Sequence, residues 1–419
     1  MQVFIIPLVA WLLCSGWAAG LPADVDLTIP HQKEALVNSL RCLETIRGDE
    51  ERIARTRNFV AENLAYFGDE QAAMAVLRGS PPHYLVPSGC VDAAMLLLGH
   101  GQIQSTRELL SLALDLLPFA AGRGADLVQF QVLRMAAVTG DEAASQRAWE
   151  ASKLTQANFT FAYAAFQQDW KPNWWNRVLD RLFPGRQWRD LKKSATRDEE
   201  IAWKSERTVD YYSALLFLRE AESRARVGQS YPASWIQFVE AGIRAPAINT
   251  RPAGLSAELA KLAALEGRSQ AALIQVEQTW RQIGGWAPQM TGVYRIERDL
   301  ALVLAGIPEA GSQRTEAKGR IAKRLEILSK HLDQYEQMLQ IPLLAEAFHV
   351  LGDAEQAQAA WQTAAKLCAQ TQNPEGQSIG LTRIWMSYAR ANAWPTKEIE
   401  AVLLKTEKQL PGAYSKVNF

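Results

Sequence analysis

Signals for β-structure are scarce in this sequence. Few stretches alternate β-branched with polar residues, and no Asn-Gly or Asp-Gly pair separates two apolar stretches. Strong helix formers such as Ala, Leu, Gln, Glu and Arg are abundant instead, and apolar residues recur at the three- and four-residue spacing of a helix face. We therefore predict an all-α protein.

An excess of charge of either sign is also absent. The 419 residues include 45 Lys and Arg against 45 Asp and Glu, so the formal net charge is zero. General nucleic-acid binders need surplus cations to displace the counterions of phosphates. We therefore predict no nucleic-acid partner.

Motifs for metals and nucleotides are missing as well. None of the five histidines has a second His, a Cys or a carboxylate at a recognised metal spacing. The sequence contains neither H-E-x-x-H nor the phosphate loop G-x-x-x-x-G-K-[ST]. We predict no catalytic residue, no metal site and no cofactor.

The N-terminus is the part of the chain that indicates a compartment. The run from Val3 to Leu13 is apolar except for Pro7, and small residues follow it. This order is typical of a secretory signal, with Ala18 and Gly20 at the −3 and −1 positions of the cleavage site. We expect an exported protein, periplasmic or secreted. Because no Lys or Arg precedes the apolar run, an uncleaved membrane anchor is the alternative.

Cysteine is rare, with three residues left after the predicted signal. Cys42, Cys90 and Cys368 form an odd, sparse set rather than a disulfide framework. We expect three buried thiols, and a bridge between Cys42 and Cys90 is the alternative in an oxidising compartment.

A Gly-containing turn recurs along the chain between Ala- and Leu-rich segments. Each glycine is placed to end one helix in a left-handed conformation, and an Asp after it, present in three of four copies, can cap the next helix. The four segments are 67–73, 139–144, 266–272 and 351–357. Weaker copies begin at Gly101 and Gly228.

Positions after each turn repeat as well. A small residue stands five positions after the glycine in three copies, and a large apolar residue stands nine positions after it in all four. The small residues are Ala73, Ala272 and Ala357, and the large ones are Leu77, Trp149, Val276 and Trp361. In the weaker copies Leu110 stands at nine and Ala233 at five.

This pattern resembles the tetratricopeptide repeat, most clearly from Ala345 to Ala364. The resemblance implies an irregular α-solenoid of antiparallel helical hairpins whose concave face binds peptides or proteins. We divide the chain into a signal peptide (1–20), N-terminal repeats (21–157), an aromatic and basic insertion or atypical hairpin (158–205) and C-terminal repeats (206–419).

The insertion contains the candidate binding residues. If its central part is helical, Trp174 and Trp175 lie on an apolar face, whereas Arg177 and Arg181 lie on a basic one. Such a helix can dock on a partner or lie at a membrane surface. The alternative is that the aromatic face packs on the repeats. A second basic helix, Arg314–Lys330, is expected to carry Arg320, Lys323 and Arg324 on its surface.

We predict an exported helical-repeat scaffold that binds a protein or peptide partner at the cell envelope. One alternative is a carbohydrate-active or peptidoglycan-handling enzyme on an all-α frame, because Glu222-Ser223 resembles the catalytic Glu-Ser of lytic transglycosylases. Another is a peripheral membrane protein that docks through the Trp-rich basic segment.

The predicted cleavage site gives a first test. If the N-terminal segment is a signal, the exported protein should begin at Leu21, and N-terminal sequencing or intact mass will show it. A mass that retains residues 1–20 would favour the membrane anchor.

Overall fold

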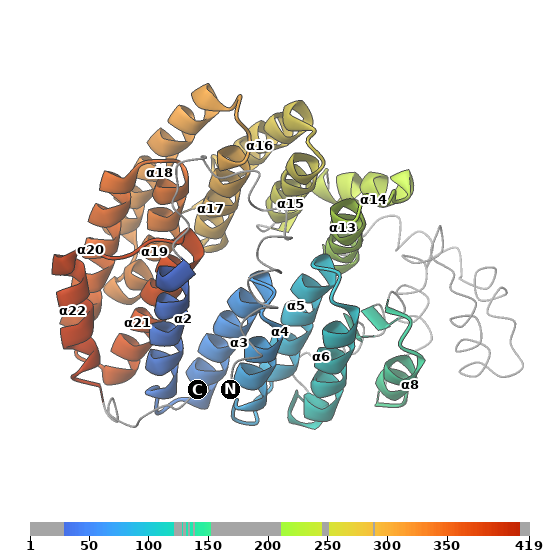
Figure 1. Ribbon diagram of the computed structural model, residues 1–419, viewed down its shortest axis with the longest axis horizontal. Helices are drawn as coiled ribbons and strands as arrows, with labels where there is room; N and C mark the ends of the chain where they lie inside the picture. The colour runs from blue at the N-terminus through green and yellow to red at the C-terminus, as the bar shows by residue number, and fades with distance from the viewer. Residues whose placement is uncertain are drawn as a thin grey trace, which may run out of the picture. The chain divides into compact units, whose positions relative to one another are not determined.

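The computed structural model describes residues 29–120, 128, 131–132, 135–136, 139–151, 211–244, 251–287 and 290–410 (Figure 1). Within these ranges all regular structure is helical and no strand occurs. The predicted all-α fold class is therefore confirmed.

The helices form two compact units, which we call the middle unit and the terminal unit. The middle unit is Gly48–Leu255, and the terminal unit joins the chain up to Arg47 to Ser256–Phe419. The helices of the middle unit are α3 (Glu50–Tyr66), α4 (Glu70–Arg78), α5 (Val86–Gly99), α6 (Ile103–Leu116), the short 3-10 helix η2 (Leu117–Ala120), α8 (Glu142–Ala151), α13 (Tyr211–Arg226) and α14 (Ala233–Ile243).

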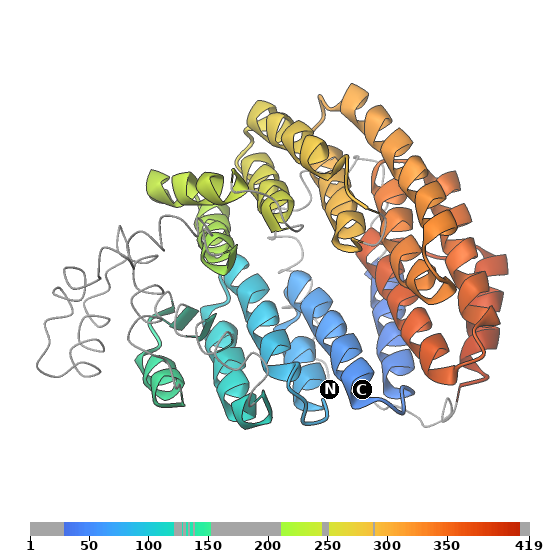
Figure 2. The same ribbon diagram turned by 180° about the vertical axis from the view of Figure 1, so that it is seen from behind.

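The terminal unit contains helices from both ends of the described chain. They are α2 (Ile29–Glu44), most of α15 (Arg251–Leu265), α16 (Ser269–Ile283), α17 (Gly292–Ala305), α18 (Gly311–His331), α19 (Gln334–Val350), α20 (Ala354–Gln370), α21 (Pro374–Ala391) and α22 (Lys397–Glu407). The predicted segments 21–157, 158–205 and 206–419 stay a prediction. The structure shows that the first and the last of these segments touch, because α2 lies against α21 (Figures 1 and 2).

The glycine turns are the most regular local feature of the structure. All six predicted glycines have a positive φ, between 70 and 76°. The residue after each glycine donates its N–H to the carbonyl five residues earlier, for example Asp353 to Phe348 at 2.9 Å. This is the Schellman arrangement, which satisfies carbonyls at the end of the first helix. The six glycines are Gly68, Gly101, Gly140, Gly228, Gly267 and Gly352.

The aspartates that follow three of these glycines cap the second helix, as predicted. Asp69 accepts a hydrogen bond from the N–H of Ala72, and Asp141 accepts one from Ala144. Asp353 accepts one from Gln356. In the fourth copy Arg268 stands at this position, and its side chain makes no capping bond.

The repeated small and large residues are buried. Ala73, Ala272 and Ala357 are fully buried, and the large residues Leu77, Val276 and Trp361 are at most 1% exposed. The side chain of Trp149 lies outside the described set. One weaker position was predicted wrongly, because Ala233 is the first residue of α14 and is exposed.

Side chains connect turns that are about one hairpin apart in sequence. In the middle unit the Gln102 amide donates to the Gly68 carbonyl at 3.1 Å, and Nε of Arg107 donates to the Thr139 carbonyl at 3.1 Å. In the terminal unit the Gln334 amide donates to the Leu367 carbonyl at 3.2 Å. Each bond joins residues 32 to 34 positions apart. The two bonds of the middle unit join neighbouring hairpins, whereas the Gln334 bond joins the two helices of one hairpin, α19 and α20.

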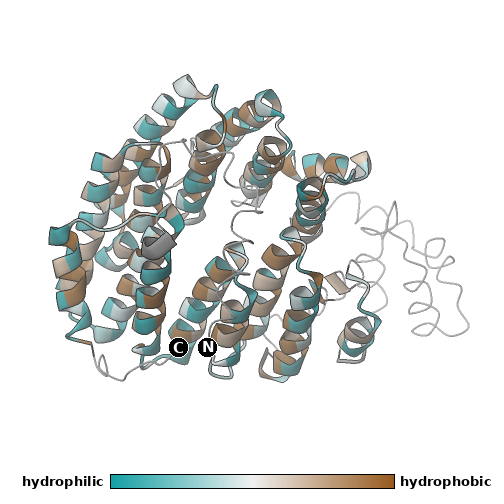
Figure 3. Ribbon diagram, viewed as in Figure 1, coloured by the Kyte–Doolittle hydropathy of each residue, from teal (hydrophilic) through white to brown (hydrophobic). Residues whose placement is uncertain are grey.

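In the terminal unit α17, α19, α21 and α2 follow one another as neighbours, and α18, α20 and α22 pack on them (Figures 1 and 2). Hydrophobic residues lie where helices meet, and hydrophilic ones on outer sides and turns (Figure 3).

Aromatic rings fill the space between α20 and α21. Trp361 and Tyr388 stack with centroids 4.2 Å apart, and Trp385 lies 6.1 Å from Tyr388. This cluster fixes the side of α21 that faces α20.

Cys42, Cys90 and Cys368 are free and buried, as expected. Burial raises the pKa of Cys42 well above its usual range and raises the pKa values of Cys90 and Cys368 to about 12. The three thiols are therefore protonated and act as small apolar side chains.

Gly380 gives a test of the packing of α21. A Cβ atom there would lie 2.3 Å from Sδ of Met338 and 2.9 Å from Sγ of Cys368, and both side chains are fully buried. Gly380→Ala should therefore lower the free energy of unfolding by about 1–3 kcal/mol, measured by urea unfolding of the full chain.

The matched control is Gly319→Ala in the interior of α18, where a Cβ meets nothing within 4 Å. That change should leave stability equal or raise it by about 0.5–1 kcal/mol. Equal stability of both variants and the wild type would contradict the close approach at Gly380.

Candidate functional site

The predicted binding residues Trp174, Trp175, Arg177 and Arg181 lie outside the described residues. Their role therefore stays a prediction. The candidate site that the structure presents lies elsewhere, in the terminal unit.

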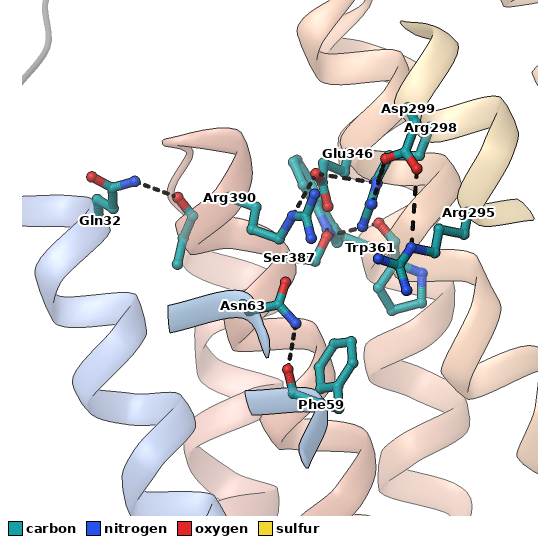
Figure 4. Close-up of polar contacts among 12 residues, drawn as sticks. Gln32, Phe59, Asn63, Arg295, Arg298, Asp299, Glu346, Trp361, Ser387 and Arg390 are labelled. Carbon is teal, nitrogen blue, oxygen red and sulfur yellow. Dashed lines mark hydrogen bonds and ion pairs between the residues drawn. The ribbon is translucent and has the colours of Figure 1, made fainter. Parts of the chain in front are cut away.

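Five charged side chains of α17, α19 and α21 form one network, which we call the charge cluster (Figure 4). Its members are Arg295, Arg298, Asp299, Glu346 and Arg390. They come from three consecutive neighbouring helices, so the cluster joins all three.

Glu346 of α19 is the centre of the cluster. Its Oε1 accepts a hydrogen bond from Nε of Arg390 at 3.0 Å and lies 3.8 Å from Nε of Arg298. Nε of Arg298 also donates to Oδ1 of Asp299 at 3.0 Å. The Glu346 side chain is 1% exposed, against 4% for Arg298 and 6% for Arg390. Three charges that are almost fully buried therefore depend on one another.

The electrostatics of the cluster favour its ionised form. Burial alone would raise the pKa of Asp299, but Arg298, Arg295 and Arg390 lower it below its ordinary value of 3.8. For Arg298, burial acts to lower the pKa, but the neighbouring Asp299 and Glu346 carboxylates raise it above its ordinary value. Because the folded-state pKa of Asp299 is depressed, its contribution to stability is complete only above about pH 5 and is lost progressively as the pH falls through the folded-state pKa.

Neutral hydrogen bonds position the helices around the cluster. Pro342 lies inside α19, one turn before Glu346, and its carbonyl accepts the hydroxyl of Ser387 at 2.7 Å. The indole N–H of Trp361 donates to the same Ser387 oxygen at 3.0 Å. One hydroxyl of α21 therefore connects α19 to α20 beside the charged residues (Figure 4).

The cluster reaches solvent at one end. The Arg295 side chain is 51% exposed and that of Asp299 is 27% exposed, and both lie on one face of α17 with the half-buried Leu302. On α19 a similar line of half-buried residues recurs every seven positions. Its members are Glu336, Leu343 and Val350. The exposed faces of these two helices thus present both polar and apolar side chains.

Glu222, the residue that resembles a transglycosylase acid, is held by two guanidinium groups. Arg219 donates to its Oε2 and Arg226 to its Oε1, each at 2.8 Å, and the side chain is 7% exposed. A general acid must present a proton to its substrate. The buried, doubly paired Glu222 carboxylate has no such geometry.

The chain also contains a Gly-x-Ser-x-Gly sequence at 376–380, a pattern typical of hydrolase nucleophiles. Those nucleophiles stand on a sharp turn between a strand and a helix. Here the segment lies inside α21, and Ser378 is 1% exposed. Its hydroxyl bonds to the Pro374 carbonyl and to the hydroxyl of Thr45. Ser378 is therefore a packing residue.

The second basic helix, α18, differs from its predicted surface. Lys323 is exposed, but Arg324 is buried and pairs with Glu297 at 3.4 Å. Arg320 lies over the Trp280 ring, 4.9 Å from its centroid. The prediction was wrong for Arg324 because α18 turns this residue toward α17, which the local sequence pattern does not reveal.

Two further classes of site find no support in the described part of the chain. No group of three or more His, Cys, Asp or Glu side chains within it could hold a metal ion. None of its helices combines the length and apolar character that crossing a bilayer requires.

Comparison of the chain with protein-family models, with curated proteins and with solved structures gave no match. Any assignment of function therefore depends on the residues and their geometry.

The sequence offered one weak signal for the charge cluster. Glu346 stands alone as a charged residue within the apolar run 343–348 of a helical segment, whereas Arg298 is flanked by Glu297 and Asp299 and gives no such signal. A charge on a buried helix face needs a partner. The identity of that partner is a long-range property, since 48 residues separate Arg298 from Glu346 and 44 separate Glu346 from Arg390.

Removing the central charge tests the cluster. Glu346→Gln leaves Arg298 and Arg390 buried without a carboxylate between them, so it should lower the free energy of unfolding by about 3–5 kcal/mol. The matched control is Glu326→Gln on α18, where an exposed pair with Lys330 is removed and no measurable change is expected. Urea unfolding at pH 7 measures both. Equal effects of the two substitutions would show that the cluster contributes no more than a surface ion pair.

Proposed function

We propose that the chain is an exported helical-repeat scaffold that binds a protein or peptide partner at the cell envelope. The hydrogen bonds between successive turns carry this proposal. Gln102 to Gly68 and Arg107 to Thr139 hold neighbouring hairpins in register, as expected of a tandem stack. A stack of this kind presents a surface that is formed before the partner arrives, so little ordering is needed on binding.

The charge cluster supports the same proposal. A polypeptide partner supplies both apolar side chains and charged groups, and the edge of α17 and α19 offers both kinds of contact. Arg295 and Asp299 stand near Leu302, and Leu343 and Val350 follow on α19. Arg298 pairs with both Asp299 and Glu346, so it connects the polar group on this edge of α17 to α19.

We assign a second partner-binding surface, besides the edge of α17 and α19, to the Trp-rich basic segment. This assignment depends on the sequence alone. Trp174 and Trp175 supply apolar area, and Arg177 and Arg181 attract an acidic surface. The same composition suits a membrane surface, which is the reason for testing both binding partners with one set of variants.

The experiment compares a fourfold variant with a matched control. The variant replaces Trp174, Trp175, Arg177 and Arg181 by alanine, and the control replaces the exposed arginines Arg244 and Arg281. Tagged full-length proteins are incubated with envelope extracts, and bound proteins are identified by mass spectrometry. We expect a protein captured by the wild type and the control to be lost from the fourfold variant, by at least about tenfold, with helical circular dichroism unchanged.

Two results would overturn parts of the proposal. Equal capture by all three proteins removes the Trp-rich segment from the binding surface. Loss of vesicle flotation at low salt in the fourfold variant, without any protein capture by the wild type, would replace the scaffold by a peripheral membrane protein.

A further inference from the structure

Helix α2 is covalently joined to one unit and packed into the other. It belongs to the terminal unit, but the chain continues directly into the middle unit at Gly48 and returns to the terminal unit only at Ser256. Non-covalent contacts alone therefore keep α2 beside α21, its principal neighbour in the terminal unit.

Several small and polar side chains of α2 are buried in the terminal unit. On α2 the buried residues include Ala35, Asn38, Ser39 and Cys42, with Leu43 near its end, and the buried Thr45 and Ile46 directly follow the helix. Small side chains bury little apolar area, so separating this part of the interface exposes less hydrophobic surface than separating helices that meet through Leu and Phe.

Three hydrogen bonds connect the two helices along their length. The Gln32 amide donates to the Ala389 carbonyl at 3.1 Å, and the Ser39 hydroxyl donates to the Thr382 carbonyl at 3.0 Å. The Thr45 and Ser378 hydroxyls are 2.9 Å apart. All these groups are neutral, and water can take the place of each partner when the helices separate.

One ion pair adds a stronger attachment. Arg41 of α2 donates from Nη1 to Oε1 of Glu407 on α22 at 2.9 Å, and Nη2 bonds to Asn38. The Arg41 side chain is 39% exposed, whereas that of Glu407 is 7% exposed. The second carboxylate oxygen of Glu407 is buried and has no hydrogen-bond partner among the described residues. While α2 stays in place, Glu407 therefore depends on Arg41 to balance a buried charge.

We propose that α2 is a releasable strap, fastened by Arg41 and Glu407, that opens while the rest of the terminal unit stays folded. Opening uncovers the face of α21 that carries Ser378 and Thr382. This face fits a helix like α2 itself, with small and hydroxyl side chains at three- and four-residue spacing and one guanidinium for Glu407. Opening of the strap does not depend on the proposed scaffold function, whereas a partner helix in this groove does.

Hydrogen exchange of the full chain, read by mass spectrometry, tests the opening. Arg41→Ala should speed exchange in α2 by at least about tenfold, because it leaves Glu407 buried without its cation and so favours the open state. Adding Glu407→Gln removes that charge, and the double variant should return most of the protection. The matched control Lys33→Ala removes a positive charge from an exposed position of the same helix and should change nothing.

Exchange in α19 and α20 separates a strap from general loss of stability. A strap requires these helices to keep wild-type protection in Arg41→Ala. If α19 and α20 lose protection together with α2, the terminal unit unfolds as a whole and the proposal is wrong. It is equally wrong if Arg41→Ala leaves exchange in α2 unchanged.

A synthetic peptide with the sequence 29–47 tests the groove without knowledge of the partner. Fluorescence anisotropy should show that the labelled peptide binds the Arg41→Ala chain at least about tenfold more tightly than the wild-type chain, because the mutated strap competes less well. The control is the same peptide with Ser39 and Thr45 replaced by valine. It lacks the two hydroxyl groups that bond to α21 and should therefore bind more weakly. Equal affinity for the Arg41→Ala and wild-type chains would show that opening of α2 exposes no binding groove. That result would not bear on the scaffold proposal, which the capture experiment tests separately.

Discussion

The left-handed glycine turn is the constraint on which the rest of the structure depends. A residue with a Cβ atom at φ near +70° costs about 1–2 kcal/mol relative to glycine, so this type of turn forms most cheaply where a glycine stands. The turn fixes where the next helix begins, and Asp69, Asp141 and Asp353 then cap it. Positions five and nine after the glycine acquire a fixed direction as a result. Ala357 and Trp361 are buried for this reason, and the same geometry brings Gln102 to the carbonyl of Gly68.

Features that depend on the ten residues after a turn could be predicted from the sequence. Glycine conformation, capping by aspartate and burial at five and nine all belong to this class, and the failure at Ala233 falls in a copy without the capping Asp. Features that depend on which helices become neighbours could not be predicted. The burial of Arg324 follows from the position of Glu297 on α17, and the role of Ser378 follows from Thr45, which lies 333 positions away in the chain.

The charge cluster illustrates the same limit and adds a physical reason for its existence. An apolar trio at the positions of Arg298, Glu346 and Arg390 could be as stable as the ion pairs, because burying charges removes their hydration. Apolar side chains, however, tolerate a helix that slides by one turn, about 5.4 Å, whereas a charge shifted by that distance loses its partner. We therefore interpret the cluster as a device that sets the register of α17, α19 and α21. The rigid placement of Asp299 at the edge follows from this register.

Helix α21 is bound differently on its two sides, and this difference decides where the terminal unit can open. Toward α19 it is held by Arg390 and Glu346, whose separation would leave two buried charges uncompensated. Toward α2 it is held by hydroxyl and carbonyl groups that water satisfies when the helices part. The buried charge on the α2 side, Glu407, resides on α22 and becomes accessible to water once Arg41 leaves. Separating α21 from α19 would therefore break a buried ion pair, whereas separating it from α2 would break bonds between neutral groups. This difference in bonding is the reason for our proposal that the terminal unit opens at α2 while the register of α17, α19 and α21 stays intact.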